Sequence, residues 1–333
     1  MQDNNLLLKV EDLKTYFFLK EGTLKVVDKS SFEIKRGETL GIAGDSGCGK
    51  SITAQSILRI VPQGGKIVGG KILFNLSNKG FIDLAKLDPK GKEIRSIRGK
   101  EISMIFQEPM TSFSPVHTIG NQIMEVIRLH QDLSKRDAKN KAVELLKKVG
   151  MPKSSQMIDA YPFNLSGGMR QRAMIAMALS CQPSLLIADE PTTAVDVTIQ
   201  AQVLQLVKEL QKEFNMALII ITHDLAVIAE LADKVLIMLY LGKDVEYTSA
   251  DEIFYNPLHP YTKGLLHSIP KLTAGPDEKI VPMTGSLPSP YDLPEGCMFH
   301  RRCSEFMPGV CDKKEPPFIE VKKDHKVSCF LYK

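Results

Sequence analysis

Residues 44–51 have the types and spacing of a loop that binds phosphate groups. They read Gly-Asp-Ser-Gly-Cys-Gly-Lys-Ser and fit the pattern G-x-x-x-x-G-K-S/T. The glycines let backbone N–H groups close around phosphate oxygens, the lysine carries a charge to the β- and γ-phosphates, and the serine hydroxyl ligates Mg²⁺. A plain glycine turn is the competing interpretation. The residues expected to contact a nucleotide are Gly44, Ser46, Gly47, Cys48, Gly49, Lys50, Ser51 and Ile52.

Two further apolar runs end on groups that could act on the same ligand. Residues 185–188 are apolar and lead into Asp189 and Glu190, and the apolar run 102–106 leads into Gln107. Open α/β sheets bind ligands at the carboxyl ends of their strands. Asp189 suits Mg²⁺, directly or through water, and Glu190 could accept the proton of an attacking water. Gln107 could reach the metal or that water, although each of these residues could also be an ordinary solvated turn.

A third strand end and a second anion site complete the set. His223 follows the apolar run 217–222 and could contact a γ-phosphate, with a turn or helix-cap histidine as the alternative. Ser166, Gly167 and Gly168 precede a helix expected over 172–181. A hydroxyl, free N–H groups and the positive end of a helix dipole attract an anion. The chain therefore contains two separate phosphate-binding devices.

The elements that must position these groups follow an α/β pattern. Residues 39–43 read as a buried strand before the phosphate loop, and 52–60 as the helix after it. Residues 119–150 have helical spacing with a cap at Ser134, and a long amphipathic helix is expected over 197–214. The chain starts with what reads as an antiparallel group of short strands, over 6–10, 14–19, 24–27 and 31–34.

Composition excludes several classes of protein. With 333 residues, 43% apolar and 25% charged, the chain can form a large α/β domain and a smaller appendage. No apolar run approaches the roughly 20 residues of a membrane span, and the first residues lack a secretion signal. We therefore expect a cytosolic protein whose membrane role is peripheral. The net charge of +4 is too small to indicate nucleic acid as a partner.

Over about residues 6–248 the motifs resemble the nucleotide-binding subunits of ATP-binding-cassette (ABC) transporters. The corresponding motifs are Walker A at 44–51, the Q-loop glutamine Gln107, the signature at 165–171, Walker B at 185–189 with the catalytic carboxylate Glu190, the D-loop at 194–196 and the switch histidine His223. The resemblance implies an ABC-type P-loop NTPase domain over 1–250, with a mixed sheet core, an antiparallel β subdomain and a helical subdomain at about 110–180. Residues 251–333 would form a small Cys-rich extension.

The resemblance also implies a mechanism and partners. Two cassettes pair head to tail around two ATP molecules, and Ser166, Gly167 and Gly168 grip the ATP of the second subunit, which is a paralogue or another copy. Lys50 and Mg²⁺, held by Ser51, Gln107 and Asp189, neutralise the phosphates while Glu190 polarises water. Phe17 corresponds best to the aromatic residue that stacks on adenine, with Tyr16 as the second candidate.

Residues 251–268 and 296–303 resemble the oligopeptide/dipeptide importer branch of this family. The resemblance implies ATP-driven import of peptides, two integral-membrane permease subunits, an indirect link to an extracytoplasmic peptide-binding protein, and a location on the cytoplasmic face of the cell membrane. Nickel importers are close relatives, so nickel or another cargo is an alternative. A soluble ABC ATPase acting on ribosomes or DNA is a further one, disfavoured by the single cassette and the lack of a long coiled-coil insertion.

Four of the six cysteines lie in the tail, spaced C-x5-C-x7-C-x17-C: Cys297, Cys303, Cys311 and Cys329. Zinc sites favour tight C-x2-4-C pairs and ferredoxins favour C-x2-C-x2-C-x3-C, and neither spacing is present. The concentration of four thiols in a short Pro-rich segment of a cytosolic protein still needs an explanation. We expect an iron–sulfur (4Fe-4S) cluster first, zinc second, and unliganded or disulfide-forming cysteines third, with the resemblance to importer subunits favouring the cluster.

Overall fold

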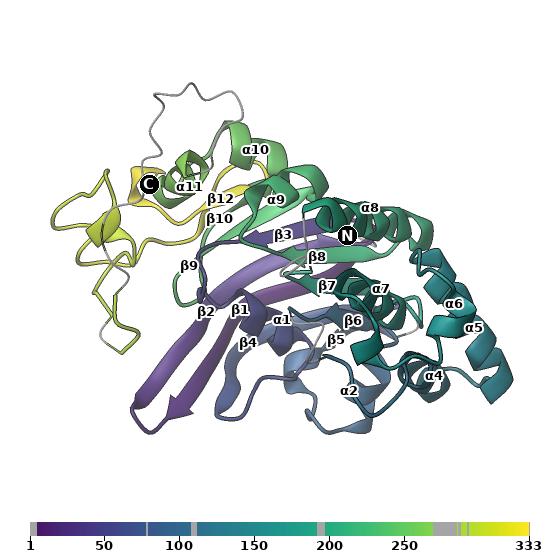
Figure 1. Cartoon of the computed structure of the whole chain (residues 1–333). Helices are drawn as coiled ribbons and strands as arrows, with labels where there is room; N and C mark the ends of the chain where they lie inside the picture. Colours follow the sequence, from purple (N-terminus) through teal and green to yellow (C-terminus); the bar gives the residue numbers. More distant parts are fainter. Residues whose placement is uncertain are drawn as a thin grey trace. The chain divides into compact units, whose positions relative to one another are not determined.

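The structure is a computed structural model that divides into two compact units. It describes residues 5–77, 79–107, 112–191, 197–268, 285, 288–291 and 293–332. The first unit comprises Met1–Leu7, Lys35–Glu38 and Leu87–Ile221, and the second comprises Leu8–Ile34, Thr39–Lys86 and Thr222–Lys333. Among the helices that the structure describes, none has the length and apolarity to cross a membrane. Figure 1 labels most helices and strands of both units.

The first unit contains three parallel strands in the order β8-β7-β6. These strands are β6 (Ile102–Ile105), β7 (Leu185–Asp189) and β8 (Ala217–Ile221). Every residue in them is buried, as expected of parallel strands covered on both faces. Ile105 pairs with Ala188, so β6 and β7 end at the same edge of the sheet. Gln107 and Glu190 therefore leave the sheet side by side, as the sequence predicted.

Helices make up most of the rest of the first unit (Figure 1). They are α2 (Lys92–Ile97), α4 (Ile119–His130), α5 (Lys135–Lys148), α6 (Ser154–Met157), α7 (Gly167–Ala178), α8 (Val197–Phe214) and the 3₁₀ helix η2 (Pro162–Asn164). Helices α4, α5 and α7 pack on one another around buried side chains that include Ile123, Ala142 and Ile175. The predicted cap at Ser134 is confirmed, because its hydroxyl accepts the Asp137 N–H at 3.2 Å.

The second unit contains a four-stranded sheet in the order β2-β1-β4-β5. The strands are β1 (Leu6–Leu19), β2 (Gly22–Lys35), β4 (Gly65–Leu76) and β5 (Gly80–Asp83). The prediction of four short strands at the start of the chain was wrong, since β1 and β2 are long and continuous. Asp12 and Lys29 have positive φ values of 47° and 69°, and the register of β1 shifts between Glu11 and Lys14. Polar residues that read as turns thus form irregularities within strands.

A second set of paired strands in this unit joins the C-terminal tail to β3, the strand that precedes the phosphate loop. Its strands run in the order β11-β12-β10-β9-β3: β11 (Ile319–Lys322), β12 (His325–Val327), β10 (Lys243–Ser249), β9 (Lys234–Leu239) and β3 (Thr39–Ala43). The helices are α1 (Lys50–Ile57), α9 (Leu225–Leu231), α10 (Ala250–Tyr255), α11 (Pro260–His267), and the 3₁₀ helices η1 (Leu84–Lys86), η3 (His300–Arg302) and η4 (Phe330–Tyr332). The tail therefore adds β12 beside β10, and β11 beside β12 (Figure 1).

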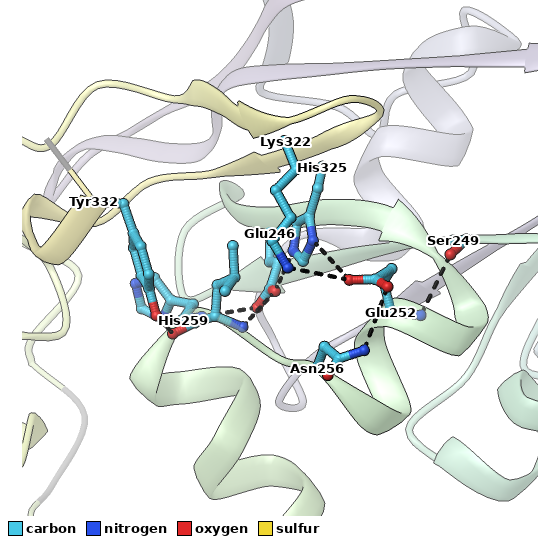
Figure 2. Close-up of polar contacts among 9 residues, drawn as sticks. Glu246, Ser249, Glu252, Asn256, His259, Lys322, His325 and Tyr332 are labelled. Atoms are coloured by element: carbon cyan, nitrogen blue, oxygen red, sulfur yellow. Dashed lines mark hydrogen bonds and ion pairs between the residues drawn. The ribbon is translucent and has the colours of Figure 1, made fainter.

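A buried network of hydrogen bonds attaches the tail to β10 (Figure 2). Glu246 of β10 is fully buried, and its carboxylate lies 2.7 Å from His325 Nε2 of β12. The same carboxylate accepts the backbone N–H groups of Leu258 at 2.7 Å and His259 at 3.0 Å. Burial opposes the charge, but these donors outweigh it and lower the pKa of Glu246. The Tyr332 hydroxyl adds a bond to the Leu258 carbonyl at 3.0 Å.

Candidate nucleotide-binding site

The phosphate loop connects β3 to α1 in the second unit, as predicted. Its backbone needs glycine at two positions: a Cβ at Gly44 would lie 2.0 Å from the Met238 carbonyl oxygen, and one at Gly49 would lie 2.4 Å from that of Val26. Both residues have positive φ values, 152° and 103°. Helix α1 begins at Lys50, two residues earlier than expected, so its first turn faces the loop.

Lys50 is held inside this loop. Its ammonium donates hydrogen bonds to the carbonyl oxygens of Gly44 at 2.8 Å and Asp45 at 2.9 Å, and lies 3.6 Å from Cys48 Sγ. The side chain is only 5% exposed. These neutral partners orient the ammonium without cancelling its charge, which suits a residue that receives a phosphate.

The first unit brings the predicted acid and glutamine together. Gln107 Nε2 donates to Glu190 Oε2 at 2.8 Å, and Asp189 lies buried at the end of β7. Glu190 has a positive φ of 46°, while its backbone N–H still pairs with the Ile221 carbonyl at 2.8 Å. A left-handed glutamate is uncommon, and such backbone strain concentrates at functional sites.

The signature helix starts earlier than predicted. Helix α7 runs over Gly167–Ala178 rather than 172–181, because Ser166 itself is the cap and accepts the Met169 N–H at 3.4 Å. The two glycines therefore form the first helical turn. Ser166 and Gly167 are exposed, which leaves them accessible to a second molecule. Buried Gln171 donates to the Pro191 carbonyl and so ties this helix to the loop after Glu190.

His223, Tyr16 and Phe17, the remaining predicted nucleotide contacts, belong to the second unit. His223 is an exposed residue of the second unit, next to Asp224, which caps α9. The Tyr16 hydroxyl donates to Asp28 Oδ1 at 2.9 Å, and burial together with this bond raises the pKa of Tyr16 to about 12. Phe17 is partly exposed and pairs with Gly65 of β4. The D-loop residues 194–196 lie outside the described residues.

The structure brings the four tail thiols together. Cys297, Cys303, Cys311 and Cys329 line one cavity of about 10 Å³. Burial raises the pKa of Cys297 to about 11, and the neighbouring thiols act in the same direction. All six cysteines are free, so the disulfide alternative was wrong. In the described part of the chain no group of three or more His, Cys, Asp or Glu side chains is placed to hold a metal ion, so the predicted metal centre is not confirmed.

Sequence reasoning missed two residues that contact the phosphate loop from far along the chain. Tyr261 accepts the Asp45 N–H at 2.9 Å, and Arg302 lies 3.7 Å from the Asp45 carboxylate. No local pattern marks such a contact, because it depends on how the tail folds back. All three residues belong to the second unit.

Asp244 of β10 gives this unit a testable pH dependence. It lines a cavity of about 570 Å³, accepts the Ser31 N–H at 2.5 Å and is 7% exposed. Burial raises its pKa from 3.8 to about 7. Between these values the folded chain keeps a proton that the unfolded chain has lost. The free energy of unfolding therefore falls as pH rises through this window, by roughly 4 kcal/mol in total.

We expect Asp244→Asn to remove this loss, since the amide still accepts the Ser31 N–H. Urea unfolding from pH 4 to 7.5 would show the variant gaining stability relative to the native chain as pH rises. His259, whose pKa burial lowers to about 4, acts in the opposite direction between pH 4 and 6.5. It is present in both proteins, so the difference isolates Asp244. A difference that stays constant with pH would contradict the prediction.

Comparison with known proteins assigns the family. Residues 27–193 match the family model described as ABC transporter, and residues 245–311 match that of the oligopeptide/dipeptide transporter C-terminal region. The oligopeptide transport ATP-binding protein AppD of Bacillus subtilis is 50% identical over 98% of this chain and 97% of its own length. The chain belongs to the ABC transporter ATP-binding proteins. OppD of Escherichia coli is 44% identical over 99% of this chain and 94% of its own length.

Solved ABC structures agree with this assignment. The dimeric bacterial ABC transporter cassette MJ0796 superposes with a TM-score of 0.64 and 25% identity, over 73% of this chain and 99% of that one. A second MJ0796 structure is a dimeric post-hydrolysis state bound to ADP and Pi. CbiO1 from Clostridium perfringens gives 0.61 and 27% identity, over 76% and 92%. This ABC protein therefore has the ABC ATPase cassette fold, with mixed α/β sheets and helices, and is an ATPase.

Proposed function

We propose that this ABC ATPase powers the import of di- or oligopeptides. The observation that carries the proposal is the match of residues 245–311 to the oligopeptide/dipeptide transporter C-terminal region, within relatives that align along nearly the whole chain. AppD, OppD and DppD are named as oligopeptide or dipeptide transport proteins. We assign residues 1–250 to the ATPase domain and 251–333 to the extension that marks this branch.

The proposed roles at the nucleotide follow from the chemistry of each side chain. Lys50 and the N–H groups of the phosphate loop bind the β- and γ-phosphates, and Phe17 or Tyr16 stacks on adenine. Glu190, oriented by Gln107, takes the proton of the attacking water, and His223 contacts the γ-phosphate.

Mg²⁺ would be held by oxygen donors of the types it prefers. These are the Ser51 hydroxyl, the Asp189 carboxylate and the Gln107 amide oxygen. When bound, the ion neutralises charge on the phosphates. The position of Asp189 supports this assignment, because it is the last residue of β7 and open α/β sheets bind their ligands at the carboxyl ends of their strands.

The exposed start of α7 supports a dimer as the working unit. We assign Ser166, Gly167 and Gly168 to the γ-phosphate of an ATP bound to a second cassette, either a copy of this chain or a paralogue. The dimeric MJ0796 cassette is a precedent for pairing.

A groove on the helical part of the first unit fits a membrane partner. It has a volume of about 520 Å³ and is lined by residues from α4 and the start of α5, including Met124, Arg128 and Leu129. Leu129 is 68% exposed, and Val116 nearby in sequence is 73% exposed. We assign this groove to an amphipathic helix from one of two permease subunits, which would hold the chain at the cytoplasmic face of the membrane.

Reconstitution in vesicles tests this function. The chain is combined with a candidate permease pair, and ATP hydrolysis is measured with empty binding protein, peptide-loaded binding protein and nickel-loaded binding protein. We expect only the peptide-loaded form to stimulate hydrolysis, whereas Leu129→Glu should abolish stimulation and leave basal hydrolysis unchanged. Stimulation by nickel would reassign the cargo, and association with ribosomes without permease binding would reject the importer.

We also propose that the four tail thiols bind a 4Fe-4S cluster, with zinc as the alternative. Four sulfur donors around one cavity support this, because such clusters take four cysteines. In a cluster each thiol binds a different iron, so the four sulfur atoms can lie farther apart than the ligands of a single zinc ion. The cavity admits about one water-sized sphere, so the loops that carry the thiols must separate to receive a cluster.

A further inference from the structure

Two residues of the C-terminal region hold the second residue of the phosphate loop from two sides. The Asp45 N–H donates to the Tyr261 hydroxyl at 2.9 Å. The Asp45 carboxylate oxygen Oδ2 lies 3.7 Å from Arg302 Nη1. Tyr261 is fully buried in α11, and the Arg302 side chain in η3 is only 11% exposed. Both contacts therefore form where water competes weakly.

Packing fixes the positions of these two side chains. The Phe299 ring meets the Tyr261 ring edge-on at 5.5 Å between centroids, and the Arg302 guanidinium lies 5.8 Å from the Phe299 centroid. The Tyr261 N–H donates to His259 Nδ1 at 3.0 Å. Burial, and then the nearby Asp45 carboxylate, raise the pKa of Tyr261, so its hydroxyl keeps its proton. The aromatic pair and the guanidinium form one rigid block.

Asp45 connects this block to Lys50, the residue that we assign to phosphate binding. Its carbonyl oxygen accepts a hydrogen bond from Lys50 Nζ at 2.9 Å, while its N–H is held by Tyr261. Fixing Asp45 therefore fixes the positions of both the loop backbone and the Lys50 ammonium. A loop that is already ordered before nucleotide binds loses less conformational freedom on binding. Its affinity for nucleotide is therefore higher.

We propose that Tyr261 and Arg302 are positioning residues for ATP, which make the C-terminal extension part of the nucleotide-binding machinery. The proposal rests on the proposed function of the phosphate loop. It assigns the extension a role in the affinity of the loop for nucleotide, separate from any role in cargo or in metal binding.

Equilibrium binding of a fluorescent ATP analogue with Mg²⁺ to the full chain tests this, together with steady-state hydrolysis. The variants are Tyr261→Phe and Arg302→Gln. Their matched controls are Tyr332→Phe, which removes a tail hydroxyl bonded to the Leu258 carbonyl, and Arg301→Gln, which changes an exposed neighbour. We expect each variant to bind the analogue about three- to tenfold more weakly, from the loss of one polar contact. The KM should rise by a similar factor with kcat unchanged.

The two substitutions should be non-additive, since both act through Asp45. Arg302→Lys should restore part of the affinity, because it keeps the charge. Variants that bind like their controls, or that lower kcat and the melting temperature without changing affinity, would show that the block is only structural and overturn the proposal. A native chain that binds no nucleotide would overturn the proposed function as well.

Discussion

Replacing Glu190 with glutamine is expected to stop ATP turnover while leaving ATP binding intact. The amide has nearly the shape of the carboxylate and can still accept the 2.8 Å hydrogen bond from Gln107 Nε2. It cannot accept a proton from water, and loss of a general base typically lowers a rate by about 10²- to 10⁴-fold. The phosphate loop, to which we assign the binding contacts, is unchanged.

The same variant should also trap a dimer. If ATP closes two cassettes and hydrolysis releases them, Glu190→Gln with ATP and Mg²⁺ should elute from a sizing column as a dimer, and the native chain as a monomer. The matched control is Glu209→Gln, an exposed glutamate on α8 that should behave as the native chain does. Unchanged turnover in Glu190→Gln would reject the assignment of Glu190.

The second large effect concerns the tail thiols. Chain purified without oxygen should be brown, with a broad visible absorption band and about four irons per chain. Replacing Cys303 or Cys311 with serine should remove most of the iron, because either change leaves three thiols at the cavity. Cys181→Ser is the matched control, since Cys181 lies outside the tail and is not part of the cavity lining.

Metal content separates the alternatives for this cavity. A colourless chain with one zinc per molecule would replace the cluster by zinc. A chain with neither metal would reject both. The measurement is independent of ATP hydrolysis, so it does not depend on the outcome at Glu190.

Motifs that lie within one stretch of sequence could be predicted because their physics is local. Gly44 and Gly49 need positive φ values and close backbone approach, and Ser134 needs only its own helix to act as a cap. The bounds of α8 were predicted correctly from its 3.6-residue spacing. Gln107 and Glu190 were expected at one edge because parallel strands end together.

Features that depend on distant parts of the chain could not be read in this way. The irregular residues Asp12 and Lys29 read as turns because local sequence does not reveal that a neighbouring strand continues past them. The left-handed backbone of Glu190 depends on its bond to the end of β8. The contact between Tyr261 and Asp45 joins residues more than two hundred positions apart, and no periodicity marks it.

The buried pair of Glu246 and His325 has a consequence for how the protein is made. Strand β10 leaves the ribosome well before β12, the strand that covers it. Until β12 arrives, β10 exposes an unpaired edge of the kind that joins other nascent chains into aggregates. Glu246 places a charge in the middle of that edge, and an inward-pointing charge discourages pairing with a foreign strand. In the finished protein His325 Nε2 lies 2.7 Å from this carboxylate and gives it a hydrogen-bond partner. The residue that anchors the tail can thus also protect the unfinished sheet.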